Sequence, residues 1–152
     1  MARPGRPAIL ELESVSALDS TSIMELDTLP EHLLVLRGGY IGLEFSQMFR
    51  RFGSQVTLLQ SGQQLLARED PDVAQAITTI LQEDGVEVLL EAHTSRAEPT
   101  RDGKIALTVS TPEAAERTLI GSHLLVATGR VLNTERLNLE AAGIKTDPNG
   151  AI

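Results

Sequence analysis

Three glycines in one short segment carry the clearest chemical signal of this 152-residue sequence. They are Gly38, Gly39 and Gly42, and they separate an apolar run from an amphipathic segment. A buried strand, a glycine turn and a helix in this order leave backbone amides free at the start of the helix, where a phosphate group can bind. A second strand is expected at Gln55–Gln60, so that Leu33–Gln60 has about the length of one βαβ unit. The segment therefore predicts a loop that binds the diphosphate of a dinucleotide.

Arg37 departs from the usual glycine pattern of such loops. The pattern G-x-G-x-x-G requires glycine at positions 37, 39 and 42, and only the last two are glycine here. The first glycine makes the tight turn out of the strand, and the second lets the backbone approach the pyrophosphate. The Arg37 side chain either lies over the phosphates or fills their site, and the sequence is compatible with both alternatives.

Two amphipathic helices are predicted to flank the strands. The first should run from Tyr40 to Phe52 and end at Gly53, because glycine readily adopts the left-handed conformation that terminates a helix. The second should begin at Asp70-Pro71, a capping residue followed by proline at the first helical position, and end at Gly85. By their helical spacing, the residues expected to form the buried faces are Ile41, Phe45, Met48 and Phe52 in the first helix, and Val73, Ile77, Ile80 and Leu81 in the second.

The predicted strands are of two kinds. Four are short and apolar, as in a parallel sheet that is buried on both faces; these are Leu33–Leu36, Val56–Leu59, Val86–Leu90 and Leu124–Ala127. Three others are expected to form an antiparallel meander with a two-residue turn at Asp102-Gly103; these are Ala92–Arg101, Lys104–Ser110 and Ala115–Ile120. The fold class is therefore α/β, a Rossmann-like parallel sheet with flanking helices plus a three-stranded antiparallel meander.

The chain is expected to have three parts. Residues 1–30 contain scattered prolines and form a linker or crossover segment, with one short helical turn at Ile23–Leu26. Residues 31–130 form the dinucleotide-binding domain. Residues 131–152 form a return crossover, with a helical turn at Leu137–Ala142 and a further turn at 147–150.

Composition argues against several classes of function. The net charge is −8, from 13 basic and 21 acidic residues without a basic cluster, which argues against nucleic acid and anionic membranes as partners. No apolar run is long enough to span a bilayer. Cysteine is absent, which excludes disulfides and thiolate nucleophiles, and His32, His93 and His123 lack the spacing of metal ligands. We therefore expect a cytoplasmic chain with neither a metal site nor a catalytic residue of its own.

Several motifs, taken in order, resemble one enzyme family. They are RGGYIGLEF at 37–45, REDP at 68–71, ATGR at 127–130 and NTERLNLEAAGI at 133–144. Together they resemble the flavin-dependent pyridine nucleotide–disulfide oxidoreductases, which include lipoamide dehydrogenase, glutathione reductase and mercuric reductase. The REDP and LEAAGI stretches are most similar to the mercuric reductase branch. The resemblance covers residues 21–152 and corresponds to the nicotinamide-nucleotide domain of that family.

This resemblance implies a domain that binds NAD or NADP and holds the reduced nicotinamide for hydride transfer to FAD. In the family, FAD and the redox-active cysteine pair belong to a separate domain, so the resemblance implies an isolated domain that is not catalytic alone. Tyr40 is implied to cover the nicotinamide pocket, and Glu44 to touch the nicotinamide end. The residues expected to contact the dinucleotide are Gly38, Gly39, Tyr40, Ile41, Gly42, Glu44, Gln60, Ser61 and Gly129.

The choice between NAD and NADP stays open at this stage. Gln60 stands where NAD-preferring members carry a glutamate for the adenosine ribose, and it can still hydrogen-bond a ribose hydroxyl. Ser61 and Ala67 stand at the two positions where glutathione reductase carries arginines for the 2′-phosphate of NADP. The family loop proline is also replaced, by Leu132.

Two hypotheses of function follow from these residues. In the first, the chain is a nicotinamide-nucleotide module, whose partners are the dinucleotide and a flavin-bearing chain. In the second, it is a non-enzymatic remnant that no longer binds nucleotide and acts through oligomerisation or a partner chain. Arg37 favours the second hypothesis, whereas the ordered family motifs favour the first.

Overall fold

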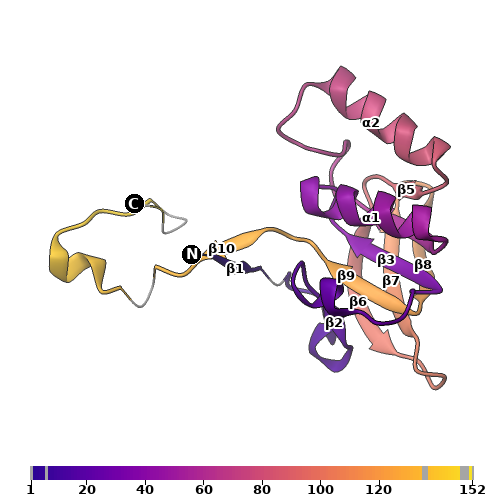
Figure 1. Cartoon of the computed structure of the whole chain (residues 1–152), viewed down its shortest axis with the longest axis horizontal. Coiled ribbons are helices and arrows are strands. Elements are labelled where there is room, and N and C mark those ends of the chain that lie inside the picture. Colours follow the sequence, from indigo (N-terminus) through magenta and orange to yellow (C-terminus); the bar gives the residue numbers. More distant parts are fainter. Residues whose placement is uncertain (1, 6, 135–136, 148–150, 152) are drawn as a thin grey trace.

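The structure is a computed structural model that describes residues 2–5, 7–134, 137–147 and 151. Figure 1 shows a body of sheets and helices, from which the segment after β10 (Arg130–Leu132) extends. β1 (Ala2–Pro4) pairs with β10 in antiparallel register, so residues near the start of the chain lie beside residues near 130.

A parallel sheet of five strands, in the order β2-β9-β3-β4-β5, forms the centre of the body. Its strands are β2 (Ala17–Leu18), β3 (His32–Leu36), β4 (Gln55–Leu59), β5 (Glu87–Leu89) and β9 (His123–Val126). The three central strands are almost completely buried, because both faces of the sheet are covered. The predicted parallel sheet is confirmed, and β2 is added to it. Two residues carry no periodic signal, so the sequence did not predict β2.

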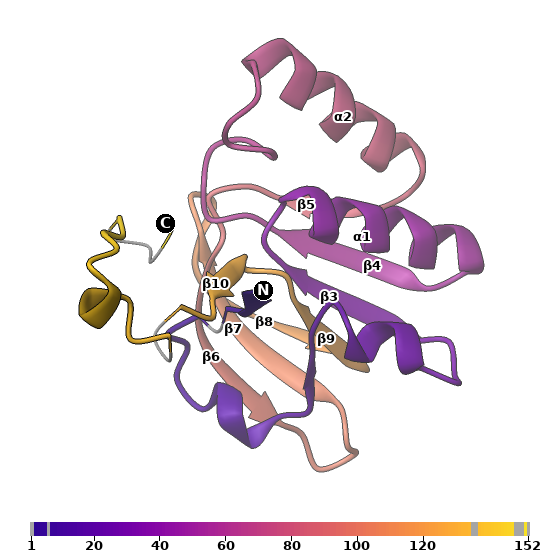
Figure 2. The ribbon, with the colours of Figure 1, turned by 60° about the vertical axis from the view of Figure 1, so that its left-hand side comes forward.

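Two helices cover one face of this sheet, and an antiparallel sheet covers the other (Figure 2). The helices are α1 (Tyr40–Phe52) and α2 (Pro71–Glu83), whose predicted starts are confirmed. α1 ends at Gly53, with a φ of 109°, as predicted. The C-cap of α2 is Asp84, one residue before the predicted cap Gly85. Gly85 follows it with a φ of 88°.

The strands supply alternate side chains to two hydrophobic clusters. Leu33 and Val35 of β3 pack in the cluster that contains the helix residues Leu43 and Leu81. Leu34 and Leu36 point the other way, into the cluster with Leu107 and Val109 of the antiparallel sheet. This two-residue alternation holds the three layers together at the centre of β3.

The antiparallel sheet consists of β6 (His93–Pro99), β7 (Ile105–Thr111) and β8 (Ala114–Gly121), as the sequence predicts. Its first turn is longer than the expected two residues, because β6 ends at Pro99 and β7 begins at Ile105. The Thr100 hydroxyl accepts from Lys104 N at 2.9 Å and donates to Asp102. These local hydrogen bonds replace the outermost rungs of the ladder.

The predicted buried face of α1 is only partly correct, because Phe45 packs against the core whereas other predicted residues are exposed. Met48 and Phe52 are 36% and 62% exposed, and Ile41 and Phe45 are only partly buried. The residues that pack against the sheet are Gly42, Leu43, Ser46 and Phe49. Small residues at 42 and 46 let the helix lie close to the strands, so the tertiary fit sets the rotation of the helix.

The predicted face of α2 is likewise only partly correct, because Ile77 and Leu81 pack in the core whereas Val73 and Ile80 do not. Val73 and Ile80 are 44% and 50% exposed, and Ile77 is half-buried, although Leu81 is buried as expected. The buried residues of α2 are Ala74, Thr78 and Leu81. The Thr78 hydroxyl donates to Ala74 O at 2.8 Å, so this polar group needs no water.

The outer segments contain short 3-10 turns. The predicted turn at Ile23–Leu26 is the 3-10 helix Ser22–Glu25, and that at Leu137–Ala142 is Leu139–Ala142. A third turn of this kind is Leu12–Ser14. The predicted turn at 147–150 falls mainly outside the described residues.

Candidate nucleotide-binding site

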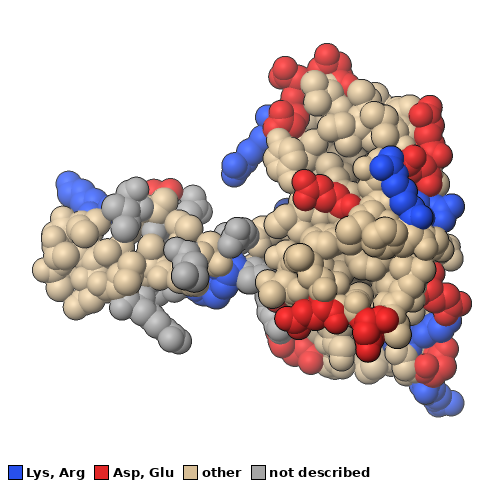
Figure 3. All heavy atoms as spheres, viewed as in Figure 1, with Lys and Arg blue, Asp and Glu red and all other residues tan. Residues whose placement is uncertain are grey.

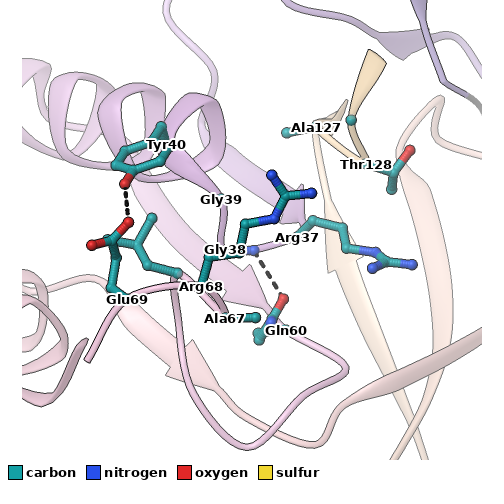
Figure 4. A pocket seen from close by; sticks show the side chains of 12 residues that line it. Arg37, Gly38, Gly39, Tyr40, Gln60, Ala67, Arg68, Glu69, Ala127 and Thr128 are labelled. Atoms are coloured by element: carbon teal, nitrogen blue, oxygen red, sulfur yellow. Dashed lines mark hydrogen bonds between the residues drawn. The ribbon is translucent and has the colours of Figure 1, made fainter. Parts of the chain in front are cut away.

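A pocket of about 330 Å³ opens where β3 gives way to α1, at the carboxyl edge of the parallel strands. Ligands of open α/β sheets bind at this edge. Figure 4 shows side chains of this pocket, which come from the glycine turn, from the loop after β4 and from the end of β9. The residues that line it are Arg37, Gly38, Gly39, Tyr40, Gln60, Leu66, Ala67, Arg68, Glu69, Ala127, Thr128 and Gly129.

Gly39 and Gly42 of the glycine turn have different surroundings. Gly39 has ample room, since a Cβ placed there meets no atom within 4 Å, and this residue borders the pocket. Gly42 has no room for a side chain, because a Cβ placed there would lie 2.1 Å from the Arg37 carbonyl oxygen. A side chain is thus excluded at 42 by helix–strand packing, whereas at 39 the open space leaves the backbone accessible to a ligand.

Gly38 faces inward. A Cβ on Gly38 would come within 2.3 Å of the Leu65 side chain. Its amide donates to the Gln60 side chain at 3.2 Å, and its carbonyl accepts from Leu66 N at 2.8 Å. Gly38 therefore joins the turn to the loop after β4, and the exposed amides begin after it.

The start of α1 supplies those amides. The first amide of α1 that the structure pairs with a backbone carbonyl is that of Leu43, which donates to Gly39 O at 3.0 Å. The Gly39 cap residue adopts an extended conformation and provides no side-chain cap. The amides that precede Leu43 carry the partial positive charge of a 13-residue helix, an arrangement that favours a bound anion.

Arg37 occupies the first glycine position with a φ of 84°, a conformation that suits glycine. Its backbone amide donates to Leu59 O at 2.8 Å, which anchors the turn to β4. Its side chain is exposed and lines the pocket together with Arg68 (Figure 4). Two arginines, Arg37 and Arg68, thus line this opening in a chain whose net charge is −8.

Gln60 lies at the end of β4 and is 7% exposed. Its Oε1 accepts from Gly38 N, and its Nε2 donates to Gln64 O at 3.0 Å. Both ends of the amide are therefore occupied by backbone groups.

Tyr40 stands on the first turn of α1, and its ring is 61% exposed. Its hydroxyl donates to the carboxylate of Glu69, as Figure 4 shows. This hydrogen bond raises the pKa of Tyr40, because ionisation would remove the donated proton and place two negative charges side by side. Tyr40 is thereby held against the loop after β4.

The predicted site residues do not all share one pocket. Gly38, Gly39, Tyr40, Gln60 and Gly129 line the pocket described above. Glu44 borders an apolar groove between α1 and α2, and Ser61 borders a separate cavity of about 350 Å³ beside His93. Ile41 is half-buried and Gly42 is buried in the helix packing.

Sequence reasoning missed several residues of the pocket. These residues are Thr128, Arg68, Glu69, Ala127 and Leu66. Their position after parallel strands could have identified these residues, because the loops that follow parallel strands meet at one edge of the sheet. The REDP and ATGR motifs both fall in such loops, at 68–71 and 127–130.

Two negative observations apply to the described residues. They contain no group of three or more His, Asp or Glu side chains that could hold a metal ion. Among them, no helix combines the length and apolar character that crossing a membrane requires.

Comparisons with known proteins agree with this architecture. A mercuric reductase of Streptomyces lividans is 42% identical over 149 residues, which are 98% of this chain and 31% of that protein. The probable pyridine nucleotide-disulfide oxidoreductase RclA of Escherichia coli (strain K12) is 42% identical over 134 residues, which are 88% of this chain and 29% of that protein. The chain thus spans about a third of the length of these relatives.

Solved structures show the same fold. The HOCl-induced flavoprotein disulfide reductase RclA from Escherichia coli matches with a TM-score of 0.84 and 39% identity, over 99% of this chain and 33% of that one. LpdA from Mycobacterium tuberculosis matches with a TM-score of 0.80 and 30% identity, over 98% of this chain and 31% of that one. The family model described as "Pyridine nucleotide-disulphide oxidoreductase" matches residues 2–152. The chain therefore belongs to the pyridine nucleotide-disulfide oxidoreductase family.

Proposed function

We propose that this chain binds NADH or NADPH with the diphosphate at the start of α1, and that it presents the nicotinamide to FAD in the parent enzyme. The observation that carries this proposal is Gly39, a pocket residue at which a Cβ would meet only open space. A glycine that packing does not require is explained by a ligand that approaches its backbone.

The surroundings of Gly39 support a diphosphate in that space. The unpaired amides at the start of α1 offer hydrogen-bond donors, and the helix dipole adds a favourable field. Arg68 lines the same pocket and can offset the charge of the phosphates. These groups together match a dianionic ligand better than a neutral one.

The remaining residues around the pocket support a nucleotide that extends to both sides. Gly129 adopts a φ of 110°, and a Cβ on it would meet no atom within 4 Å, so a ligand can approach its backbone closely. Tyr40 and Glu44 lie on the first turns of α1, where we place the nicotinamide. Tyr40 must leave Glu69 if it is to move aside for the ring.

FAD enters this proposal through the family. FAD accepts a hydride from the nicotinamide and passes electrons to a further acceptor. We propose that another domain or chain holds the flavin, and that the residues of this chain bind and orient the nicotinamide nucleotide.

Calorimetric titration of the purified chain with NADH and with NADPH tests the proposal. We expect saturable binding of at least one nucleotide and a loss of about tenfold in affinity for Gly39→Ala, because the new Cβ projects into the diphosphate site. Asp70→Ala is the matched control, since Asp70 is the cap of the other 13-residue helix and makes no side-chain cap bond. Binding of neither nucleotide by the wild-type chain contradicts the proposal.

The alternative, a remnant that no longer binds nucleotide, is favoured by one observation. Arg37 places a long side chain at the position where a dinucleotide loop has glycine, and this side chain lines the pocket. If the remnant hypothesis holds, the titrations give no heat of binding, and the chain acts through copies of itself or a partner chain. The same experiment therefore separates the two functions.

A further inference from the structure

The side chain of Gln60 is committed to the protein at both ends. Gly38 N is a donor and Gln64 O is an acceptor, so the oxygen and the nitrogen of the amide each have one chemically permitted partner. The residue is 7% exposed at the floor of the pocket. These two bonds fix the orientation of the amide, although its second N–H and the second lone pair of its oxygen are not used by them.

These bonds belong to a larger connection between the glycine turn and the loop after β4. Leu66 N donates to Gly38 O at 2.8 Å, so the loop binds Gly38 from both sides. Farther along the loop, the Gln64 side chain donates to Glu69 O at 3.1 Å, and the Glu69 carboxylate accepts from Tyr40. The loop from 61 to 69 is thus bonded to the start and to the first turn of the phosphate-binding segment.

We infer that Gln60 is a positioning residue of the nucleotide site, whose amide fixes Gly38 and the 61–69 loop and so sets the direction of the next amides along the chain. This inference rests on the proposed nucleotide binding. With Gly38 N turned inward, the amides from Gly39 onward remain for the diphosphate.

The chemistry of the two bonds explains why an amide stands here. A carboxylate at position 60 could still accept from Gly38 N, but its second oxygen would face the Gln64 carbonyl oxygen and repel it. A protonated carboxyl group has one donor and one acceptor and can replace the amide. Gln60→Glu should therefore behave as a defective variant when charged and as a near substitute for glutamine when neutral.

Titration of Gln60→Glu with NADH and with NADPH between pH 8 and pH 5.5 tests this. At pH 8 we expect about tenfold weaker binding of both nucleotides than by the wild-type chain, the effect of losing one hydrogen bond and adding a repulsion. As the pH falls, the buried carboxyl group, whose pKa is raised by burial, becomes neutral and the affinity should approach that of the wild type at the same pH. A ribose ligand predicts the reverse at pH 8, because a carboxylate would bind the ribose diol of NADH more tightly.

Gln60→Met supplies a second test that does not require a buried charge. The change removes both hydrogen bonds and keeps the length of the side chain. Inorganic pyrophosphate, which has no ribose, is titrated while the amide resonances of Gly39 and Tyr40 are followed by NMR. We expect severalfold weaker pyrophosphate binding by the variant, whereas unchanged pyrophosphate binding with weaker NADH binding makes Gln60 a ribose ligand and overturns the inference.

The outcomes also separate this inference from the proposed function. If the wild-type chain binds neither nucleotide, the proposed function fails and the inference fails with it. If the wild-type chain binds a nucleotide and Gln60→Glu binds NADH more tightly at pH 8, only the inference fails.

Discussion

Position 37 holds an arginine in a backbone conformation that glycine adopts at little cost. Its φ of 84° lies in the left-handed region, where a Cβ crowds the backbone. The turn still forms, because the Arg37 amide is bonded to Leu59 O and its carbonyl packs against Gly42. Neighbouring contacts thus hold the residue in a strained conformation.

Arg37→Gly should stabilise the fold and tighten nucleotide binding. Relief of the strained φ is expected to raise the free energy of unfolding by about 1 kcal/mol, even though glycine gains entropy in the unfolded chain. Removal of the long side chain from the pocket should strengthen NADH binding. Urea unfolding and calorimetry measure the two effects, and Arg37→Lys, which keeps the positive φ and a long cation, should show neither.

If Arg37→Gly binds NADH no better than the wild type, the arginine side chain does not obstruct the site. The side chain then lies beside the phosphates and contributes charge to their binding, which was the other alternative that the sequence allowed.

Gly42 should be intolerant of any side chain. Alanine would place Cβ 2.1 Å from the Arg37 carbonyl oxygen, a backbone atom that cannot rotate away. We expect Gly42→Ala to lower the free energy of unfolding by about 2–3 kcal/mol. Gly39→Ala is the control, with a loss within about 1 kcal/mol, because its Cβ meets no protein atom. Equal losses at the two positions would contradict the separate roles assigned to them.

At the scale of elements, a polar contact joins the first residues of β3 and β5 to Thr57 in the middle of β4. His32 Nε2 lies 2.9 Å from the Thr57 hydroxyl, which donates to the Glu87 carboxylate at 2.7 Å. Because the hydroxyl proton goes to Glu87, the histidine nitrogen donates to Thr57. This assignment places a proton on Nε2 of His32.

Burial lowers the pKa of His32, and the carboxylates of Glu87 and Glu31 oppose this effect only in part. The folded pKa thus lies below the ordinary value near 6.5 of the unfolded chain. Above that value both states are neutral and His32 contributes no pH dependence. As the pH falls below it, the unfolded chain binds the proton first, so the free energy of unfolding should decrease until the folded pKa is passed.

Unfolding by urea at several values between pH 7 and pH 5 measures this dependence. His32→Gln, which cannot titrate, should show a smaller decrease than the wild-type chain over that range. His93→Gln changes an exposed histidine on β6 and should keep the wild-type decrease. A wild-type slope in the His32 variant would show that other groups control the pH dependence.

The helix layer also leaves apolar surface on the outside of the molecule. Phe52 is 62% exposed at the end of α1, Met48 is 36% exposed, and Val73 and Ile80 of α2 are 44% and 50% exposed. The pocket between the helices is lined by Ile77, Ile80 and Leu81 among others. Exposed apolar side chains that gather on one layer of a protein often contact another protein surface.

At the scale of the whole molecule, two opposing effects govern self-association. Figure 3 shows Asp and Glu side chains around the edges of the body, with uncharged surface between them. The net charge of −8 makes copies of the chain repel one another, whereas the apolar surface of α1 and α2 favours their contact. Salt screens the repulsion and leaves the apolar attraction in place.

We therefore predict concentration-dependent dimerisation that becomes stronger as salt is raised. Phe52→Gln should weaken the association by roughly tenfold, because it removes an apolar side chain from the contact. Met24→Gln is the control, since Met24 is 76% exposed on the 3-10 helix Ser22–Glu25 and belongs to neither α1 nor α2. Sedimentation velocity over a range of protein and salt concentrations measures the effect, and a monomer under all conditions would contradict the prediction.

Local signals in the sequence located the elements of this fold. The glycine turn predicted the start of α1 at Tyr40, Gly53 predicted its end, and Asp70-Pro71 predicted the start of α2. These signals are reliable because they depend on backbone conformation within a few residues. The apolar runs likewise predicted the parallel strands, and the ordered motifs indicated the family to which the chain belongs.

The sequence by itself determined where the two α-helices, four of the five parallel strands and the glycine turn occur, because short-range sterics and hydrogen bonding decide these features. Only the tertiary structure decided which helix faces are buried, since close approach to the sheet selects Gly42 and Ser46 over Met48 and Phe52. It also decided that Gln60 bonds to Gly38, a residue 22 positions away in the chain. Contacts of this range follow from how the layers pack, and no spacing within a single element encodes them.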